Sequence, residues 1–108
     1  MKPVLMTGHH LLLTDAIKSL TQEKFQKLFR HAPDILRARV ELSFENNRLD
    51  KNSFTAKGIL EVSGNDCVAS ATTEDMYKSI DELVRKLDRQ VRRRAKIWRG
   101  KRKDAIAA

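Results

Sequence analysis

The spacing of apolar residues changes along the chain, and this change is what most constrains the fold. In residues 35–45, apolar and polar side chains alternate, and Leu36 is the first of the alternating apolar residues. Residues 54–62 alternate in the same way. Successive side chains of a β-strand point to opposite faces, so the alternation predicts two strands with one buried face each. Residues 14–31 and 75–99 instead place apolar residues three or four positions apart, which predicts two amphipathic helices.

Two shorter apolar runs complete the set of strands. Residues 2–7 form an extended run that ends at Gly8, and residues 67–71 form another. The second run follows residues 63–66 (SGND), whose Gly-Asn pair suits the positive φ of a tight hairpin turn. The polar residues 46–52 predict a loop between the two alternating strands.

Both predicted helices begin and end at residues that are typical of helix ends. Thr14 offers a side-chain oxygen to cap the first helix, and Pro33 ends it because proline has no backbone N–H. Thr72 and Asp75 have the spacing of a capping box before the second helix, and Gly100 is its predicted stop. The second helix then covers about 26 residues, which makes it longer than a sheet strand, so its final turns should extend past the sheet.

The predicted order is strand, helix, three strands and helix, which indicates a two-layer α+β fold (β-α-β-β-β-α). Both amphipathic helices are expected to cover one face of a four-stranded mixed sheet, the layout of double-stranded RNA-binding domains. The helix between the first two strands should make that pair parallel, and the other strands should form an antiparallel meander. With 108 residues in all, we expect one domain over residues 1–100 and a short, basic, flexible tail over residues 101–108.

Charge is concentrated at one end of this chain. Residues 85–103 hold eleven Lys and Arg against one acid, Asp88, whereas the other 89 residues hold 11 basic and 13 acidic side chains. The formal net charge of +8 is therefore the difference between a slightly acidic body and a strongly basic helix end. Such a concentrated charge predicts a docking surface for a polyanion.

The basic residues of the second helix are ordered by helical spacing. Steps of three and four residues place one set on a single stripe, which points away from the apolar seam: Arg85, Arg89, Arg92, Lys96, Arg99 and Lys103. Lys86 and Arg93 widen this stripe. Arg outnumbers Lys here, and the planar guanidinium can pair two donors with phosphate oxygens, which favours nucleic acid. A membrane-surface helix would need its apolar face free, but that face is committed to the core.

RNA is favoured over DNA by what the chain does and does not contain. The sequence has neither a helix-turn-helix pair nor a Cys/His zinc-finger set. Phe44 and Phe54 fall within the buried sets of their strands, so an exposed aromatic platform of the RRM kind is not expected. Two interpretations of Trp98 remain open: it packs at the end of the apolar side of the second helix, or it stacks on a base of the nucleic acid.

Other classes of function are disfavoured. The chain has no apolar run long enough to span a membrane and no motif for a nucleophile, phosphate loop or metal site, so we expect neither an enzyme nor a cofactor. The lone Cys67 fits a reducing cytoplasm. His9 and His10 are interpreted as exposed loop residues, and Tyr77 is expected in the core with its hydroxyl at the surface.

Three stretches carry a resemblance to a known family. They are Thr7–Gly8 with Leu13–Ala16, the segment KFQKL at residues 24–28, and the segment DMYKSIDELVRKLDRQ at residues 75–90. Together they resemble the ribosome hibernation promoting factors and the related ribosome-associated translation inhibitor, over residues 2–99.

The resemblance implies a non-enzymatic protein that acts on resting ribosomes under stress or in stationary phase. Members of this family bind the small ribosomal subunit and its rRNA between head and body, where mRNA and tRNAs would lie, and thereby repress translation. The short chain resembles the short form of the family, which supports ribosome dimers together with a separate modulation factor. Whether this chain promotes or opposes dimers stays open, and we expect the isolated protein to be a monomer.

The family pattern also indicates rRNA-binding residues. Lys24 and Lys27 of the first helix and Lys86, Arg89 and Arg93 of the second fall at basic positions of that pattern. The stripe adds further residues, so the predicted rRNA-binding set is Lys24, Lys27, Arg85, Lys86, Arg89, Arg92, Arg93, Lys96 and Arg99. Two alternatives remain: a general double-stranded RNA-binding module, and a protein-binding modulator of transcription, which a dense Arg stripe suits poorly.

Overall fold

The computed structural model describes residues 2–46, 52–62 and 66–107, with side chains through Arg93. The elements follow in the predicted order: β1 (Val4–His9), α1 (Asp15–His31), β2 (Ile35–Asn46), β3 (Asn52–Val62), β4 (Cys67–Thr73) and α2 (Met76–Ala107). The fold class predicted from the spacing of apolar residues is thereby confirmed. Residues 63–65 of the predicted hairpin turn and residues 47–51 of the predicted loop lie outside the described residues.

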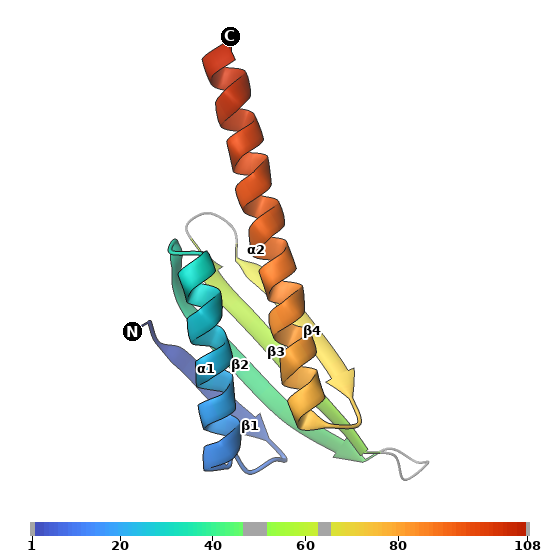
Figure 1. The fold of residues 1–108 in the computed structure, drawn as a ribbon. Helices are drawn as coiled ribbons and strands as arrows, with labels where there is room; N and C mark the ends of the chain where they lie inside the picture. Colours follow the sequence, from blue (N-terminus) through green and yellow to red (C-terminus); the bar gives the residue numbers. More distant parts are fainter. Residues whose placement is uncertain (1, 47–51, 63–65, 108) are drawn as a thin grey trace.

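The four strands form one sheet in the order β1-β2-β3-β4 (Figure 1). β1 pairs with β2 in parallel, with Val4 opposite Ala38, as a helical crossover requires. β2 pairs with β3 and β3 with β4 in antiparallel register, which confirms the predicted meander.

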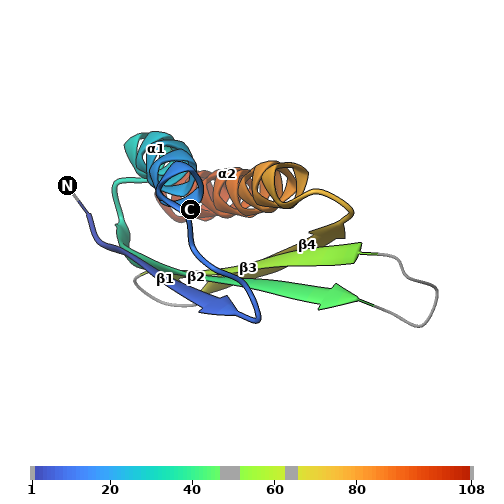
Figure 2. The same ribbon diagram turned by 90° about the horizontal axis from the view of Figure 1, so that it is seen from below.

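Both helices lie on the same face of the sheet and form a helix layer, while the other face carries no helix (Figure 2). The fully buried side chains come from both layers, and the largest are Phe25, Ile35, Leu42, Leu60, Ile80, Leu83 and Leu87. Gly58 of β3 lies directly beneath α2, since a Cβ at this position would be 3.0 Å from Leu87 Cδ1. This close approach packs the apolar side of α2, with Leu83 and Leu87, tightly against the sheet.

Two apolar positions differ from the sequence expectation. Ile35 is buried and Leu36 is 64% exposed, because the β2–β3 register shifts between Ile35 and Arg37. This irregularity moves the start of the apolar set by one residue. Tyr77 is half exposed and not in the core, because the buried seam of α2 begins at Met76 and continues through Ile80.

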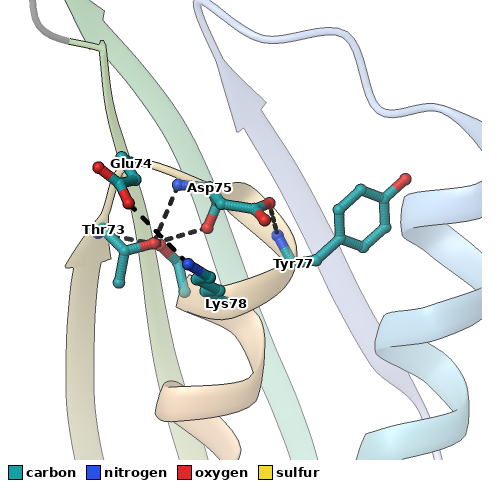
Figure 3. A network of polar contacts seen from close by, with 6 residues as sticks. Thr73, Glu74, Asp75, Tyr77 and Lys78 are labelled. Carbon is teal, nitrogen blue, oxygen red and sulfur yellow. Dashed lines mark hydrogen bonds and ion pairs between the residues drawn. The ribbon is translucent and has the colours of Figure 1, made fainter.

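The helix starts confirm one predicted cap and correct the other. Thr14 caps α1, because its hydroxyl accepts a hydrogen bond from Ile17 N at 3.2 Å. The capping box predicted at Thr72 is wrong: Thr72 stays in β4, where its hydroxyl lies 2.9 Å from that of Thr55. Asp75 is the cap of α2, because its carboxylate accepts from Tyr77 N at 3.0 Å (Figure 3).

A polar network fastens the start of α2 to the sheet, and Figure 3 shows the part of it around Thr73 and Asp75. Ser79 is fully buried, and its hydroxyl donates to Phe54 O of β3 at 2.6 Å. The same oxygen accepts from Thr73 N at 3.1 Å, and the Thr73 hydroxyl donates to Asp75 O at 2.6 Å. These bonds fix the angle at which α2 leaves β4 and crosses the sheet.

The far end of α2 lies beyond the predicted stop. Gly100 does not end the helix, which has 32 residues and continues to Ala107. A glycine inside a helix costs only about 1 kcal/mol, and residues 101–107 are mostly good helix formers. α2 extends past the sheet, as predicted from its length (Figure 1). The division into a domain over residues 1–100 and a tail over residues 101–108 stays a prediction.

Candidate nucleic-acid interface

The helix layer carries the basic residues that the sequence singled out. α1 and α2 lie side by side on the same face of the sheet and run in the same direction (Figures 1 and 2). The apolar side of α2, with Leu83 and Leu87, is buried against the sheet, while Arg85, Arg89 and Arg93 are exposed. The packing of the seam thus orients the charge toward solvent.

An ion-pair bridge joins the two helices. Lys24 Nζ of α1 lies 2.9 Å from Asp81 Oδ1 of α2, and Arg85 of the next turn lies 2.9 Å from Asp81 Oδ2. The hydrogen bond from Lys24 lowers the pKa of Asp81 most, and the charges of Lys24 and Arg85 act in the same direction against the effect of burial. Asp81 therefore stays ionised and keeps both cations in fixed positions.

A groove of about 260 Å³ lies between the helices. α1 lines it with Lys24, Lys27, Leu28 and His31, and α2 lines it with Val84 and Asp88. Leu28 is buried and Lys27 is exposed, so the groove has an apolar floor and a cationic rim. Asp88 Oδ2 also pairs with Arg92 Nε at 3.1 Å.

A second groove, of about 460 Å³, lies on the other side of α2, along the edge strand β4. It is lined by Lys86, Arg89 and Arg93, together with Ala69, Ser70 and Gln90. Lys86 Nζ donates to Ser70 O at 2.8 Å, and Gln90 Nε2 donates to Val68 O at 2.9 Å. These bonds hold α2 against β4 and give the edge strand side-chain partners.

The open face of the sheet has a different character. Arg37 and Arg39 both pair with Glu61. In the second pair, Arg39 Nη2 lies 2.7 Å from Glu61 Oε1. The hydrogen bond from Arg37 lowers the pKa of Glu61. Exposed Leu5 and Val68 lie on the same face. Arg37 and Arg39 share one carboxylate and lie beside apolar residues, whereas Lys27, Arg89 and Arg93 of the helix layer are exposed and form no ion pair with another described residue. The helix layer is therefore better suited to a polyanion.

Seven of the nine predicted rRNA-binding residues lie among the described side chains of the helix layer: Lys24, Lys27, Arg85, Lys86, Arg89, Arg92 and Arg93. Lys96 and Arg99 lie on the part of α2 whose side chains are outside the described residues, and so does Trp98. Their roles stay predictions. Phe44 and Phe54 form a cross-strand pair with ring centroids 5.1 Å apart, and both are partly buried.

Sequence reasoning missed three residues of this surface. Asp81 bridges the helices, and His31 and Asp88 line the groove between them, although the sequence pattern assigns none of the three to a site. The spacing of four residues from Asp81 to Arg85 and from Asp88 to Arg92 could have indicated the pairs within α2. The contact with α1 depends on tertiary packing, so the sequence pattern contains no sign of it.

Two further findings concern other chemistry. Among the residues that the structure describes, no group of three or more His, Cys, Asp and Glu side chains is arranged to hold a metal ion. Within the same ranges, no helix combines the length and the apolar character needed to cross a membrane.

Comparisons with known proteins agree on one family. The model of the sigma 54 modulation protein / S30EA ribosomal protein family matches residues 4–98. The ribosome hibernation promoting factor of Azotobacter vinelandii is 40% identical over 86 residues, which are 80% of this chain and 76% of the relative. That of Escherichia coli K12 is 34% identical over 86 residues, covering 80% of this chain and 85% of the relative.

Solved structures share the fold. A ribosomal subunit interface protein from Coxiella burnetii superposes with a TM-score of 0.75 at 24% identity, over 86% of this chain and 97% of that one. The N-terminal domain of Thermus thermophilus Protein Y superposes with a TM-score of 0.73 at 29% identity, over 86% and 98%. Both the family model and the relatives cover most of the sequence. The chain therefore belongs to the sigma 54 modulation protein / S30EA ribosomal protein family, together with the ribosome hibernation promoting factors.

Proposed function

We propose that this protein binds the small ribosomal subunit through its helix layer and represses translation while ribosomes rest, under stress or in stationary phase. The observation that carries the proposal is the asymmetry between its two faces. On the helix layer, Lys27, Arg89 and Arg93 are exposed and form no ion pair with another described residue, whereas Arg37 and Arg39 on the open sheet face share Glu61. The names of the relatives support the ribosome as the partner, and rRNA phosphate is the polyanion that such a surface fits.

The proposed binding site is the channel that mRNA and tRNAs occupy, and the proposed action is steric. Lys27, Arg89 and Arg93 are exposed and would contact rRNA phosphates. The part of α2 beyond the sheet would extend this contact through Lys96 and Arg99. The protein needs no catalytic group or cofactor for this action, and it would work in the cytoplasm, where ribosomes are.

Co-sedimentation with purified small subunits tests the proposal. The informative variant is Arg89→Glu with Arg93→Glu, because both side chains are exposed on the helix layer. Lys86 is left unchanged, since its bond to Ser70 O gives it a structural role. The matched control is Arg39→Glu with Lys57→Glu, the same charge change at exposed residues of the open sheet face. We expect the first variant to lose the subunit and the control to keep it; equal binding by both would contradict the proposal.

A competition experiment separates this function from general binding of double-stranded RNA, which the two-layer fold would also permit. A protein that occupies the mRNA and tRNA channel is displaced from small subunits by mRNA with initiator tRNA. A general duplex binder is displaced equally well by any RNA duplex. Sucrose gradients of whole ribosomes, run with and without a modulation factor, then show whether the protein also supports ribosome dimers.

A further inference from the structure

Asp88 is the one acid among the eleven basic residues of the segment 85–103, and its position calls for an explanation. A carboxylate within a phosphate-binding stripe weakens the attraction for the backbone of a nucleic acid. Its pair with Arg92, four residues away on the same helix, is of a kind that contributes little to stability. The Asp88 side chain is 29% exposed and lines the groove between α1 and α2.

The lining of this groove combines three kinds of chemistry. Leu28 and Val84 supply apolar surface, and Lys27 and His31 lie one turn apart on the α1 side. Asp88 faces them from α2 with acceptor oxygens only. The volume of about 260 Å³ lies just below the range of roughly 300–1,000 Å³ typical of pockets for drug-sized ligands, so it suits a single base.

We propose that the groove receives one unpaired nucleotide of the bound RNA and that Asp88 reads its base. This inference rests on the proposed function, because it takes RNA to be the ligand of the helix layer. The base would lie on Leu28 and Val84, with its phosphate beside Lys27 and His31. The Asp88 carboxylate would accept hydrogen bonds from the base, as carboxylates accept from amino groups on base edges. Arg92 holds one oxygen of this carboxylate and so fixes its orientation.

The acceptor chemistry of Asp88 discriminates between bases. Guanine presents its ring N–H and its amino group side by side, and these two donors match the two oxygens of a carboxylate. Uracil has no amino group, and its single ring N–H lies between two carbonyl oxygens that a carboxylate repels. We therefore expect guanine to bind best in the groove and uracil to bind worst.

The test compares two oligoribonucleotides of equal length and charge, an oligouridylate and the same oligomer with one central guanosine. Fluorescence anisotropy should give the wild-type protein at least about fivefold higher affinity for the guanosine oligomer, the lower end for a bidentate base contact. In Asp88→Ala this ratio should fall to about one. Asp88→Ala also changes the net charge of the protein, but the two oligomers carry the same number of phosphates. This change therefore affects both affinities equally and leaves their ratio unaffected. The matched control is Glu82→Ala, which removes an exposed acid of α2 that does not line the groove, and it should keep the ratio.

A second measurement locates the base. On addition of guanosine monophosphate, the methyl NMR resonances of Leu28 and Val84 should shift more than on addition of uridine monophosphate. A wild-type ratio of one, or a ratio that Asp88→Ala leaves intact, would overturn the inference. This failure is distinct from that of the proposed function, which depends on small-subunit binding by the wild-type protein and not on base preference.

Discussion

Lys24 of α1 and Asp81 of α2 are joined by an ion pair of 2.9 Å, although 57 positions separate them in the sequence. Asp81 also binds Arg85, so one carboxylate fixes two cations of the helix layer. The pair therefore links the relative position of the two helices to the arrangement of the charges that they present.

The first prediction concerns the stability that this bridge contributes. Lys24→Met and Asp81→Asn should each lower the free energy of unfolding, but by no more than about 1 kcal/mol, because the pair is partly exposed. Urea denaturation of both single variants and of the double variant measures the coupling. The double variant should lose less than the sum of the two single losses, whereas strictly additive losses would show that the pair does not interact in solution.

The second prediction concerns pH. The pKa of Asp81 is lowered in the folded protein, chiefly by the hydrogen bond from Lys24. The stability from this group is therefore fully present above its unfolded pKa of about 4 and is lost as the pH falls through the lower folded value. The difference in urea midpoint between the wild type and Asp81→Asn should be constant from pH 7 to 5 and shrink toward pH 3. A difference that grows with acidification would have the wrong sign.

The third prediction compares two neighbouring acids. Asp75→Ala should cost about 1 kcal/mol of stability, because its carboxylate caps α2 through Tyr77 N. Glu74→Ala should cost less than about 0.5 kcal/mol, since the pair of Glu74 with Lys78, at 3.9 Å, is exposed. Both variants remove one negative charge and therefore have the same net charge. The difference between their losses in thermal unfolding measures the contribution of the cap. Equal losses would mean that Asp75 does not cap the helix.

The fourth prediction concerns salt. If Arg89 and Arg93 contact phosphates, their replacement by Gln should reduce the slope of log affinity for small subunits against log salt by about two. Arg39→Gln with Lys57→Gln, on the open sheet face, should leave the slope unchanged. Filter binding over a series of KCl concentrations gives both slopes. A slope unaffected by loss of the two arginines would place the phosphate contacts elsewhere.

The sequence predicts the order and type of every element because the periods of its apolar residues differ clearly between strands and helices. It misplaces Leu36, since the irregularity beside Ile35 depends on pairing with β3 and not on the pattern within β2. It also misplaces the start of α2. Thr72 and Asp75 have the spacing of a capping box, but pairing with β3 keeps Thr72 in the strand.

In the candidate site, too, the sequence predicts what depends on spacing within one element but not what depends on contacts between elements. Helical spacing alone places Arg85, Arg89 and Arg92 on one stripe of α2, away from the buried seam. The groove next to Asp88 could not be predicted in this way, because it exists only where α1 packs beside α2. Likewise the two roles of Lys86, basic by sequence and bonded to Ser70 O, become evident only from the contact with β4.

A cryo-EM structure of the protein on the small ribosomal subunit tests the central claim most directly. The claim predicts that the helix layer faces rRNA in the mRNA and tRNA channel, with phosphates within ion-pair distance of Lys27, Arg89 and Arg93. The open sheet face, with Arg37 and Arg39 paired to Glu61, should point away from the rRNA. A complex in which the open sheet face contacts the rRNA, or in which the protein binds outside this channel, would contradict it.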